Sequence, residues 1–319
     1  FFPGKSISHT LQHPYYKKEI NMSFLKNFAR RRPKLTSALL WTLAAIITLG
    51  CFAYQDKTGP TYPLEGELPT AKGPVNYKFL RSETIGTDLA VMLCDPTPAG
   101  VTGYVNYRRY KSNDDWSRMD MAPGRFEFSR RRRTESIEGI GVKLPSLPER
   151  AGKYEYFVYI DDGQTEPFSV TRDHPIYARY KAPVPAWALL THILIIFASM
   201  TIALRTVFEA LIDGKFKGML WAAIISLLLG GFFFGPLVQL YAFGVWWSGV
   251  PFGYDWTDNK VLVELIFWLL AALLNCGKRR TRWPIYLAGA VTLLVYFIPH
   301  SLFGSEFDYR TGTGTGTIG

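Results

Sequence analysis

The chain has 319 residues, of which 48% are hydrophobic and 15% aromatic, and its mean hydropathy is +0.04. This composition argues against both a purely soluble globule and a chain buried entirely in lipid, so we expect apolar helices beside a water-exposed domain. The net charge of +10 comes from Lys and Arg clustered next to apolar runs, where they act as topology signals. No recognition motif accompanies them, so nucleic acid is excluded as the expected partner.

The three cysteines, Cys51, Cys94 and Cys276, are far apart in the sequence. They form no CxxC or CxxCH motif, which disfavours a disulfide framework, a zinc knuckle and covalently attached c-type haem.

Residues 1–35 form a basic N-terminal segment that we place in the cytoplasm. Residues 1–21 have no periodicity and are expected to be disordered, and Met22 is a more typical start for a membrane protein. The nearly uncharged run 36–54 follows a group of basic residues and is long enough to cross the ~30 Å hydrocarbon layer. Two alternatives remain for this run. It could be a cleavable signal, or Cys51 could carry a lipid, although Thr48 stands three residues before the cysteine, where a lipidation motif usually has an aliphatic residue.

The long polar segment begins with a Pro/Gly-rich linker, residues 55–74, and continues as a domain over residues 75–183. Short runs such as DLAVMLCD and KYEYFVYIDD alternate in polarity or carry β-branched and aromatic residues between turn signals. About seven such strands predict an all-β sandwich.

Two stretches of this domain, GYVNYRRYKSNDDWSRM and LPSLPERAGKYEYFVYI, resemble immunoglobulin-like or fibronectin type III-like modules over residues 75–170. In such modules a strand ending near a Trp faces a late Tyr-rich strand. The resemblance implies an adaptor or recognition module and brings no catalytic residues. Because Cys94 has no partner, the inter-sheet disulfide of true immunoglobulin domains is absent.

A basic run lies within the domain and consists of Arg130, Arg131, Arg132 and Arg133. It could hold an acidic protein partner or anionic lipid headgroups. The alternative is a solvated strand edge that discourages aggregation.

Residues 184–304 predict a four-helix membrane bundle with an outer loop at 243–260, and residues 305–319 predict a flexible tail. The expected crossings are residues 185–207, 219–242, 261–275 and 285–302. Short basic loops at 215–217 and 278–282 place one side in the cytoplasm. The fold class is therefore an α-helical membrane protein with five transmembrane helices and an Ig-like β-sandwich inserted between the first two. We expect a bacterial inner-membrane location, with the β-domain and the C-terminus outside.

Four polar residues, His192, Gln239, Glu264 and His300, fall in the outer half of these helices. His192 is deepest, ~10 Å below the end of its helix at ~1.5 Å per residue. Polar groups at such depth face the bundle or water, because exposure to lipid is costly. We therefore treat all four as candidate site residues.

Several interpretations of these residues remain open. His192 and His300 could ligate a b-type haem, and the same pair with Glu264 could hold a metal ion. Structural alternatives are an imidazole hydrogen bond to a neighbouring helix and pairing of Glu264 with Lys260 at the i, i+4 spacing.

The outer loop adds further polar residues to the mouth of the bundle, namely Asp255, Asp258 and Lys260. We interpret Asp258 as the N-cap of the following helix. The motif DWTDNK offers too few oxygen ligands for a calcium loop.

The favoured function is non-enzymatic: an accessory or scaffold protein in the lipid bilayer whose β-domain binds a protein partner on the outer side. No P-loop, GxSxG or HExxH motif is present. The first rival is a redox subunit holding b-type haem, quinone or a metal in the outer leaflet. The second rival is a transporter or small-molecule binding protein that uses the same mouth.

Overall fold

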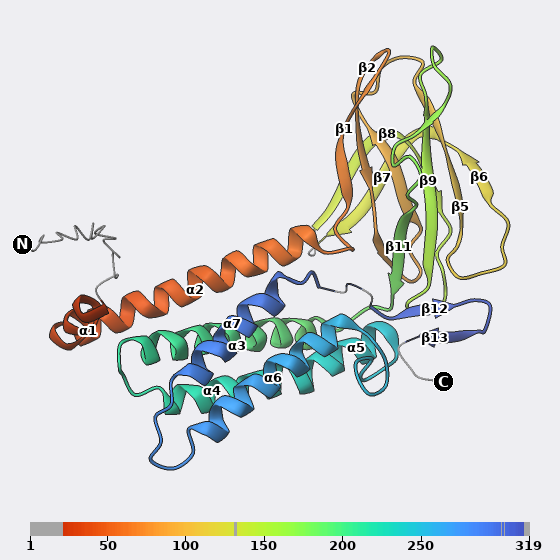
Figure 1. Cartoon of the computed structure of the whole chain (residues 1–319). Coiled ribbons are helices and arrows are strands. Elements are labelled where there is room, and N and C mark those ends of the chain that lie inside the picture. The colour runs from red at the N-terminus through yellow and green to blue at the C-terminus, as the bar shows by residue number, and fades with distance from the viewer. Residues whose placement is uncertain (1–21, 131–132, 301, 303, 316–319) are drawn as a thin grey trace, which may run out of the picture.

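The computed structural model describes residues 22–130, 133–300, 302 and 304–315. The chain folds into a group of helices and a β-domain that stands at one end of them (Figure 1). The β-domain lies between the second and third helices in the sequence, as the order of elements shows. The prediction of apolar helices together with a β-rich domain is therefore confirmed.

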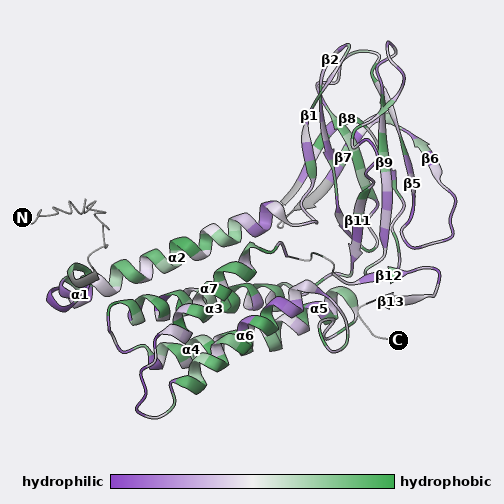
Figure 2. Ribbon diagram, in the orientation of Figure 1, coloured by the Kyte–Doolittle hydropathy of each residue, from purple (hydrophilic) through white to green (hydrophobic). Residues whose placement is uncertain are grey.

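Three helices are long and apolar enough to cross a membrane, with mean hydropathies of 1.9, 2.1 and 2.0. They are α2 (Pro33–Thr58), α3 (Ala186–Leu211) and the continuous helix Lys217–Phe243. The last consists of α4 (Lys217–Leu227), the π-helical segment η1 (Leu228–Phe234) and α5 (Gly235–Phe243). Figure 2 shows that apolar residues dominate these helices.

The remaining helices are shorter or more polar. An amphipathic N-terminal helix, α1 (Met22–Arg31), precedes α2. Helix α6 (Trp256–Leu274) carries Asp258, Lys260 and Glu264, and α7 (Trp283–Phe297) has 15 residues.

One predicted cap is wrong. The N-cap of α6 is Asp255, whose side chain accepts a hydrogen bond from the backbone N–H of Thr257, and Asp258 lies in the first turn. The helix therefore begins five residues before the expected start at Val261. The physical reason is that Asp255 is the first residue able to satisfy the free N–H groups of the new helix.

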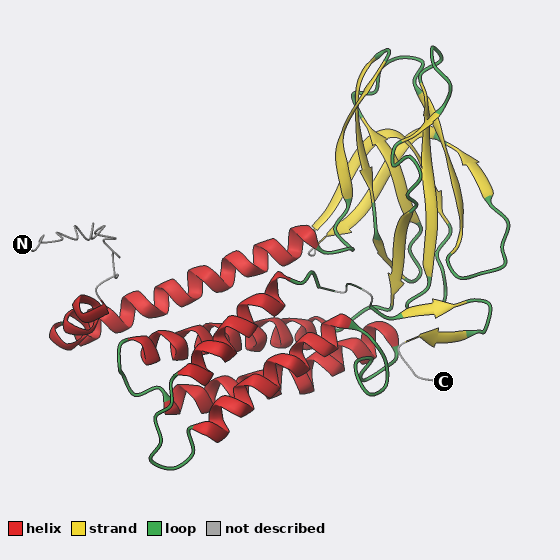
Figure 3. Cartoon of the chain, in the orientation of Figure 1, coloured by secondary structure: helices red, strands yellow, loops and turns green. Residues whose placement is uncertain are grey.

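The β-domain consists of two sheets (Figure 3). The first has five antiparallel strands, in the order β1 (Leu64–Thr70), β2 (Gly73–Phe79), β4 (Leu89–Cys94), β8 (Arg133–Leu144) and β7 (Ala122–Arg130). The second has the order β3 (Ser82–Thr84), β11 (Ile176–Lys181), β9 (Lys153–Asp161), β5 (Thr102–Arg109) and β6 (Ser117–Asp120). A short strand, β10 (Phe168–Ser169), pairs with β9, and β3 runs parallel to β11.

Both sheets contribute to one apolar core, which explains the period-two pattern of the strands. In β9, Tyr156, Val158 and Ile160 are buried and the residues between them are partly exposed. They share a cluster with Phe79 and Val91 of the other sheet. Inward-facing side chains from two sheets thus exclude water together.

The boundary of the β-domain differs from the prediction. Strand β1 begins at Leu64, inside the segment expected to be a linker. It pairs with β2 through a turn between Thr70 and Gly73, where Gly73 adopts a φ of 125°. The Pro and Gly residues that suggested a linker therefore belong to a hairpin.

The C-terminal segment also departs from the prediction of a flexible tail. Strands β12 (Glu306–Asp308) and β13 (Thr313–Thr315) form a hairpin. The hairpin docks on the β-domain, since the N–H of Phe307 donates to the carbonyl oxygen of Ala151 at 3.0 Å. The alternating Thr and Gly residues of this segment suggested flexibility, and contacts with distant residues cannot be read from composition. Residues 316–319 lie outside the described part of the chain.

The two ends of the helices differ. At one end the β-domain contacts α5, where the N–H of Ala182 donates to the carbonyl oxygen of Ala242 at 2.9 Å. At the other end Asp213, in the loop after α3, forms ion pairs with Lys26 of α1 and with Arg282, which precedes α7. The basic segments predicted to share one side thus lie together at the end away from the β-domain.

Two further predictions concern single residues or short runs. Cys51, considered for lipidation, is 7% exposed and packs with Met200 and Leu204 inside an unbroken α2. In the basic run, Arg130 and Arg133 are backbone partners in the β7–β8 hairpin. Arg131 and Arg132 lie outside the described residues.

Candidate functional site: a charged pocket between the helices and the β-domain

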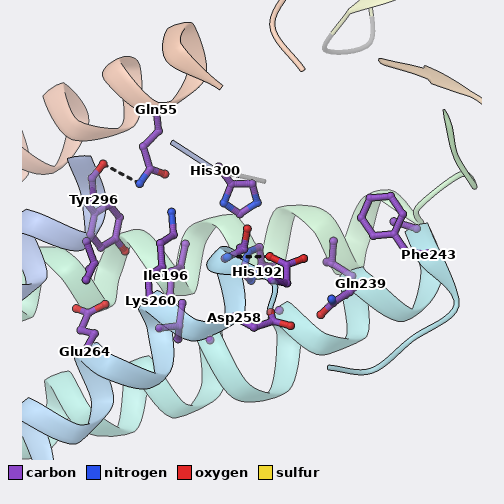
Figure 4. A pocket seen from close by; sticks show the side chains of 18 of the residues that line it. Gln55, His192, Ile196, Gln239, Phe243, Asp258, Lys260, Glu264, Tyr296 and His300 are labelled. Carbon is purple, nitrogen blue, oxygen red and sulfur yellow. Dashed lines mark hydrogen bonds between the residues drawn. The ribbon is translucent and has the colours of Figure 1, made fainter. Parts of the chain in front are cut away.

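A cavity of about 160 Å³ lies where the helices meet the β-domain. It brings together all seven polar residues that the sequence placed at the outer mouth, and we call it the charged pocket (Figure 4). These residues are His192, Gln239, Asp255, Asp258, Lys260, Glu264 and His300. They come from α3, α5, α6, the loop before α6 and the segment after α7.

Close packing of η1 against its neighbours shapes one wall of the pocket. Pro236 has no N–H to continue the α-helical pattern, and the N–H of Gly235 bonds to the carbonyl oxygen of Gly230, five residues earlier. A Cβ atom on Gly230 would lie 3.1 Å from the backbone nitrogen of Ile196, and one on Gly231 would lie 2.5 Å from Cγ1 of Val261. The two glycines therefore allow η1 to approach both α3 and α6.

His192 is held by this π-helical segment. Its Nδ1 lies 2.9 Å from the carbonyl oxygen of Gly230. A carbonyl accepts only, so Nδ1 carries the proton and a neutral imidazole keeps the lone pair on Nε2. The sequence interpretation of an imidazole hydrogen bond to a neighbouring helix is confirmed.

Ser248 organises the acidic side of the pocket, although it does not line it. It is fully buried, and its N–H donates to Asp258 Oδ2 at 2.7 Å. Its hydroxyl lies 3.1 Å from a carboxylate oxygen of both Asp255 and Asp258, and it also accepts from the amide of Gln239. Because a hydroxyl has one proton, it can donate to only one of the two carboxylates at a time.

A second polar chain crosses from α6 to α7. The indole N–H of Trp268 donates to Thr292 Oγ1 at 2.9 Å, and Thr292 in turn donates to Glu264 Oε1 at 2.8 Å. Glu264 is 2% exposed. One turn away on α6, Lys260 is 8% exposed and donates to the carbonyl oxygen of Ile298 at 3.1 Å. Glu264 and Lys260 thus both face the bundle, as expected for charges that avoid lipid.

Arg179 is a pocket residue that the sequence analysis did not identify. It comes from β11, is 8% exposed, and donates to the carbonyl oxygen of Ser305 at 3.3 Å. Its guanidinium stacks over the ring of Phe243, 4.7 Å from the centroid. In the sequence, Arg179 lies in the closing part of the β-domain, and no signal there connects it with helices α5 and α6.

His300 lines the pocket from the segment after α7. Its side chain keeps exposed surface. An imidazole can donate and accept hydrogen bonds, so His300 adds a polar group to the wall of the pocket.

The geometry gives little support to the haem and metal hypotheses. Pockets for drug-sized ligands have volumes of roughly 300–1,000 Å³, so a cavity of about 160 Å³ is too small for a porphyrin. Within the described ranges, no group of three or more His, Cys, Asp or Glu side chains could hold a metal ion. The predicted set of His192, His300 and Glu264 lines one cavity without forming such a group.

Comparisons with known proteins found no matching family model, no matching curated protein and no matching solved structure. The pocket itself is therefore the basis for assigning a function. A pocket of this size with buried groups of both charge signs suits a small polar molecule.

Proposed function

We propose that this chain is an integral membrane protein of the bacterial inner membrane that binds a small polar molecule in the charged pocket. Apolar side chains exposed on the outer faces of the helices support the membrane location. Leu194, Leu273 and Leu294 are 69%, 66% and 64% exposed, which is costly in water and favourable in lipid. Exposed Trp187, Trp246 and Tyr254 lie near the β-domain end, where an aromatic belt would meet the headgroups.

In the proposed topology the basic end faces the cytoplasm and the β-domain lies outside. Helices α6 and α7 then complete five crossings, with lengths of roughly 28 Å and 22 Å at ~1.5 Å per residue. Helix α6 can still cross the membrane, because the charged residues in its first turns face the pocket and not lipid.

The observation that carries the proposal is the arrangement of opposite charges inside the pocket. Glu264 lies at one side of Figure 4 and Phe243, on which Arg179 stacks, at the other. Burial of charged groups is expensive, so their retention around a cavity indicates a ligand that compensates them. A small zwitterion would place its carboxylate toward Arg179 and its ammonium group toward Glu264.

The β-domain closes the pocket in this proposal, because Arg179 and the Ala182–Ala242 hydrogen bond join it to α5. Partner binding by an Ig-like module stays a prediction from the sequence. The redox hypothesis gains no supporting observation from the pocket.

A thermal-shift titration of the detergent-purified protein tests the proposal. The probes are glycine, γ-aminobutyrate and glutamate as zwitterions, succinate as a carboxylate and putrescine as an amine. We expect at least one zwitterion to raise the unfolding midpoint, and we expect Glu264→Gln and Arg179→Gln to abolish that rise.

The matched control is Glu209→Gln, which changes a mostly buried carboxylate on α3 that pairs with Arg205 outside the pocket. This variant should keep the ligand response. A response that survives in both pocket variants, or no response to any probe, would contradict the proposal.

A further inference from the structure

A second cavity, of about 270 Å³, lies on the face of the β-domain that meets the helices. Its walls come from β9, β11 and β12, from single residues just before β3 and just after β5, and from the segments that follow α2 and α7. We call it the arginine–tyrosine pocket; its lining includes Arg81, Tyr110, Lys153, Tyr177, Arg179 and Glu306.

The walls of this pocket are fixed by backbone hydrogen bonds. The N–H of Arg179 donates to the carbonyl oxygen of Arg81 at 3.1 Å, and the N–H of Tyr110 donates to that of Lys153 at 2.8 Å. The rings of Tyr110 and Tyr177 pack edge to face with centroids 5.1 Å apart. A site on paired strands is more rigid than one on loops, so these side chains are held in place before any ligand binds.

The lining carries more positive than negative charge. Glu306 is its one carboxylate among the described lining residues, and it accepts hydrogen bonds from Lys111 and, at 2.7 Å, from Lys153. Among the residues described, no carboxylate forms an ion pair with Arg81 or Arg179. Two arginines thus line one cavity without forming an ion pair with a carboxylate.

Desolvation is unfavourable for these cations. Burial lowers the pKa of Arg81, and it also lowers the pKa of Arg179 despite the opposing influence of Asp255 and Glu306. Arginine stays charged at physiological pH. An anion between the two side chains would relieve this cost.

We propose that the arginine–tyrosine pocket binds a phosphate group, held by the guanidinium groups of Arg81 and Arg179. Arginine forms paired hydrogen bonds with phosphate oxygens that lysine cannot reproduce. Residues Pro60, Thr61 and Gly304, which follow the ends of α2 and α7, place the pocket at headgroup level in the proposed topology. The phosphate can therefore come from an anionic lipid or from solution, and the site does not depend on a zwitterion in the charged pocket.

Binding of two probes distinguishes these sources. Inorganic phosphate is titrated into the detergent-purified protein by calorimetry, with sodium chloride of equal ionic strength as the reference. In parallel, nanodiscs of phosphatidylglycerol and of phosphatidylcholine are compared, with retained lipid detected by native mass spectrometry. Binding of phosphate alone indicates a soluble ligand, and selective retention of phosphatidylglycerol indicates a lipid.

Of the two cavities, Arg81 lines the arginine–tyrosine pocket and not the charged pocket, so Arg81→Gln is the test variant. We expect it to weaken binding of the responding probe by about tenfold or more, the loss typical of a charge-assisted hydrogen bond. Arg118→Gln is the control, since Arg118 is exposed and pairs with Asp120 elsewhere in the domain. It should bind like the unmodified chain.

If Arg81→Gln does not fold, Arg81→Lys takes its place and is expected to bind more weakly than the unmodified chain, because it keeps the charge but loses the paired geometry. The proposal is overturned if neither phosphate nor phosphatidylglycerol binds selectively. Equal binding by the unmodified chain and the folded Arg81 variant would also overturn it. If a zwitterion raises the unfolding midpoint but neither phosphate nor phosphatidylglycerol binds, the phosphate site is wrong and the proposed ligand of the charged pocket still stands.

Discussion

The two ends of the helical bundle handle charge in different ways. At the end away from the β-domain, Lys26 and Arg282 pair with Asp213, and all three side chains are partly exposed. At the β-domain end, Lys260 and Glu264 are 8% and 2% exposed inside the bundle. Exposed ion pairs stabilise a fold by ~1 kcal/mol or less, whereas burial of charge costs several kcal/mol. In the proposed function, the first end sets the orientation in the membrane, and the buried charges of the second end bind the ligand.

The largest expected effect comes from Asp258→Ala at the β-domain end. This change removes the acceptor for the N–H of Ser248 and one of two carboxylate partners of its hydroxyl. We expect a loss of about 3 kcal/mol in the free energy of unfolding, because buried donors are left unpaired. Thermal unfolding in detergent measures it. A midpoint within error of the unmodified chain would show that the cluster does not stabilise the fold.

A slightly smaller effect is expected from Gly231→Ala. The new Cβ would lie 2.5 Å from Cγ1 of Val261, so η1 and α6 must move apart at the wall of the pocket. Overpacking of this kind costs about 1–3 kcal/mol. Gly218→Ala in α4 is the matched control, because no atom lies within 4 Å of its Cβ. The control should be neutral or stabilising in the same unfolding measurement; equal effects of the two changes would contradict the close packing of η1.

Acid should release the C-terminal hairpin. Burial favours a higher pKa for Glu306, but hydrogen bonds from Lys111 and Lys153 outweigh it and hold the pKa below its usual value. A lowered carboxyl pKa stabilises the docked hairpin at neutral pH, and this contribution is lost as the pH falls below about 4 and through the folded-state value.

Hydrogen exchange of residues 306–315 as a function of pH measures this release. In Glu306→Gln the carboxylate is absent, so the hairpin should exchange faster at neutral pH and lose its acid dependence. Protection that is independent of pH in the unmodified chain would exclude Glu306 as the anchor.

The smallest effect is expected at the basic end. Asp213→Asn removes the acceptor of two ion pairs whose side chains are 27–39% exposed. We expect a change below about 1 kcal/mol in the free energy of unfolding, since water competes for these groups. A loss as large as that in Asp258→Ala would remove the difference between the two ends.

Much of the fold could be predicted from periodicity. Alternation in β9 and the long uncharged run of α2 each depend on local sequence, and both elements are present. The shared location of His192, Gln239, Glu264 and His300 could also be predicted, because the ends of helices limit how far apart such residues can lie.

The features that were missed depend on contacts between distant segments. Arg179 reaches the charged pocket from a strand, and Ser248 joins two carboxylates from a loop that shows no regular pattern. Glu306 anchors the C-terminal hairpin through Lys111 and Lys153, which precede it by 195 and 153 residues in the sequence. Composition describes such segments as strand, loop or tail, and only tertiary structure gives them a role.

In the proposed topology the helices cross a membrane, with the charged pocket and the β-domain on the outer side. Labelling with a membrane-impermeant maleimide in spheroplasts tests this topology. Cys276 is exposed in the loop after α6, and Asn113→Cys supplies an exposed thiol on the β-domain, with Cys51 and Cys94 replaced by Ser. We predict that the thiol at position 113 is labelled in intact spheroplasts and that Cys276 is labelled only after permeabilisation. Labelling of Cys276 before permeabilisation, or protection of position 113, would contradict this topology.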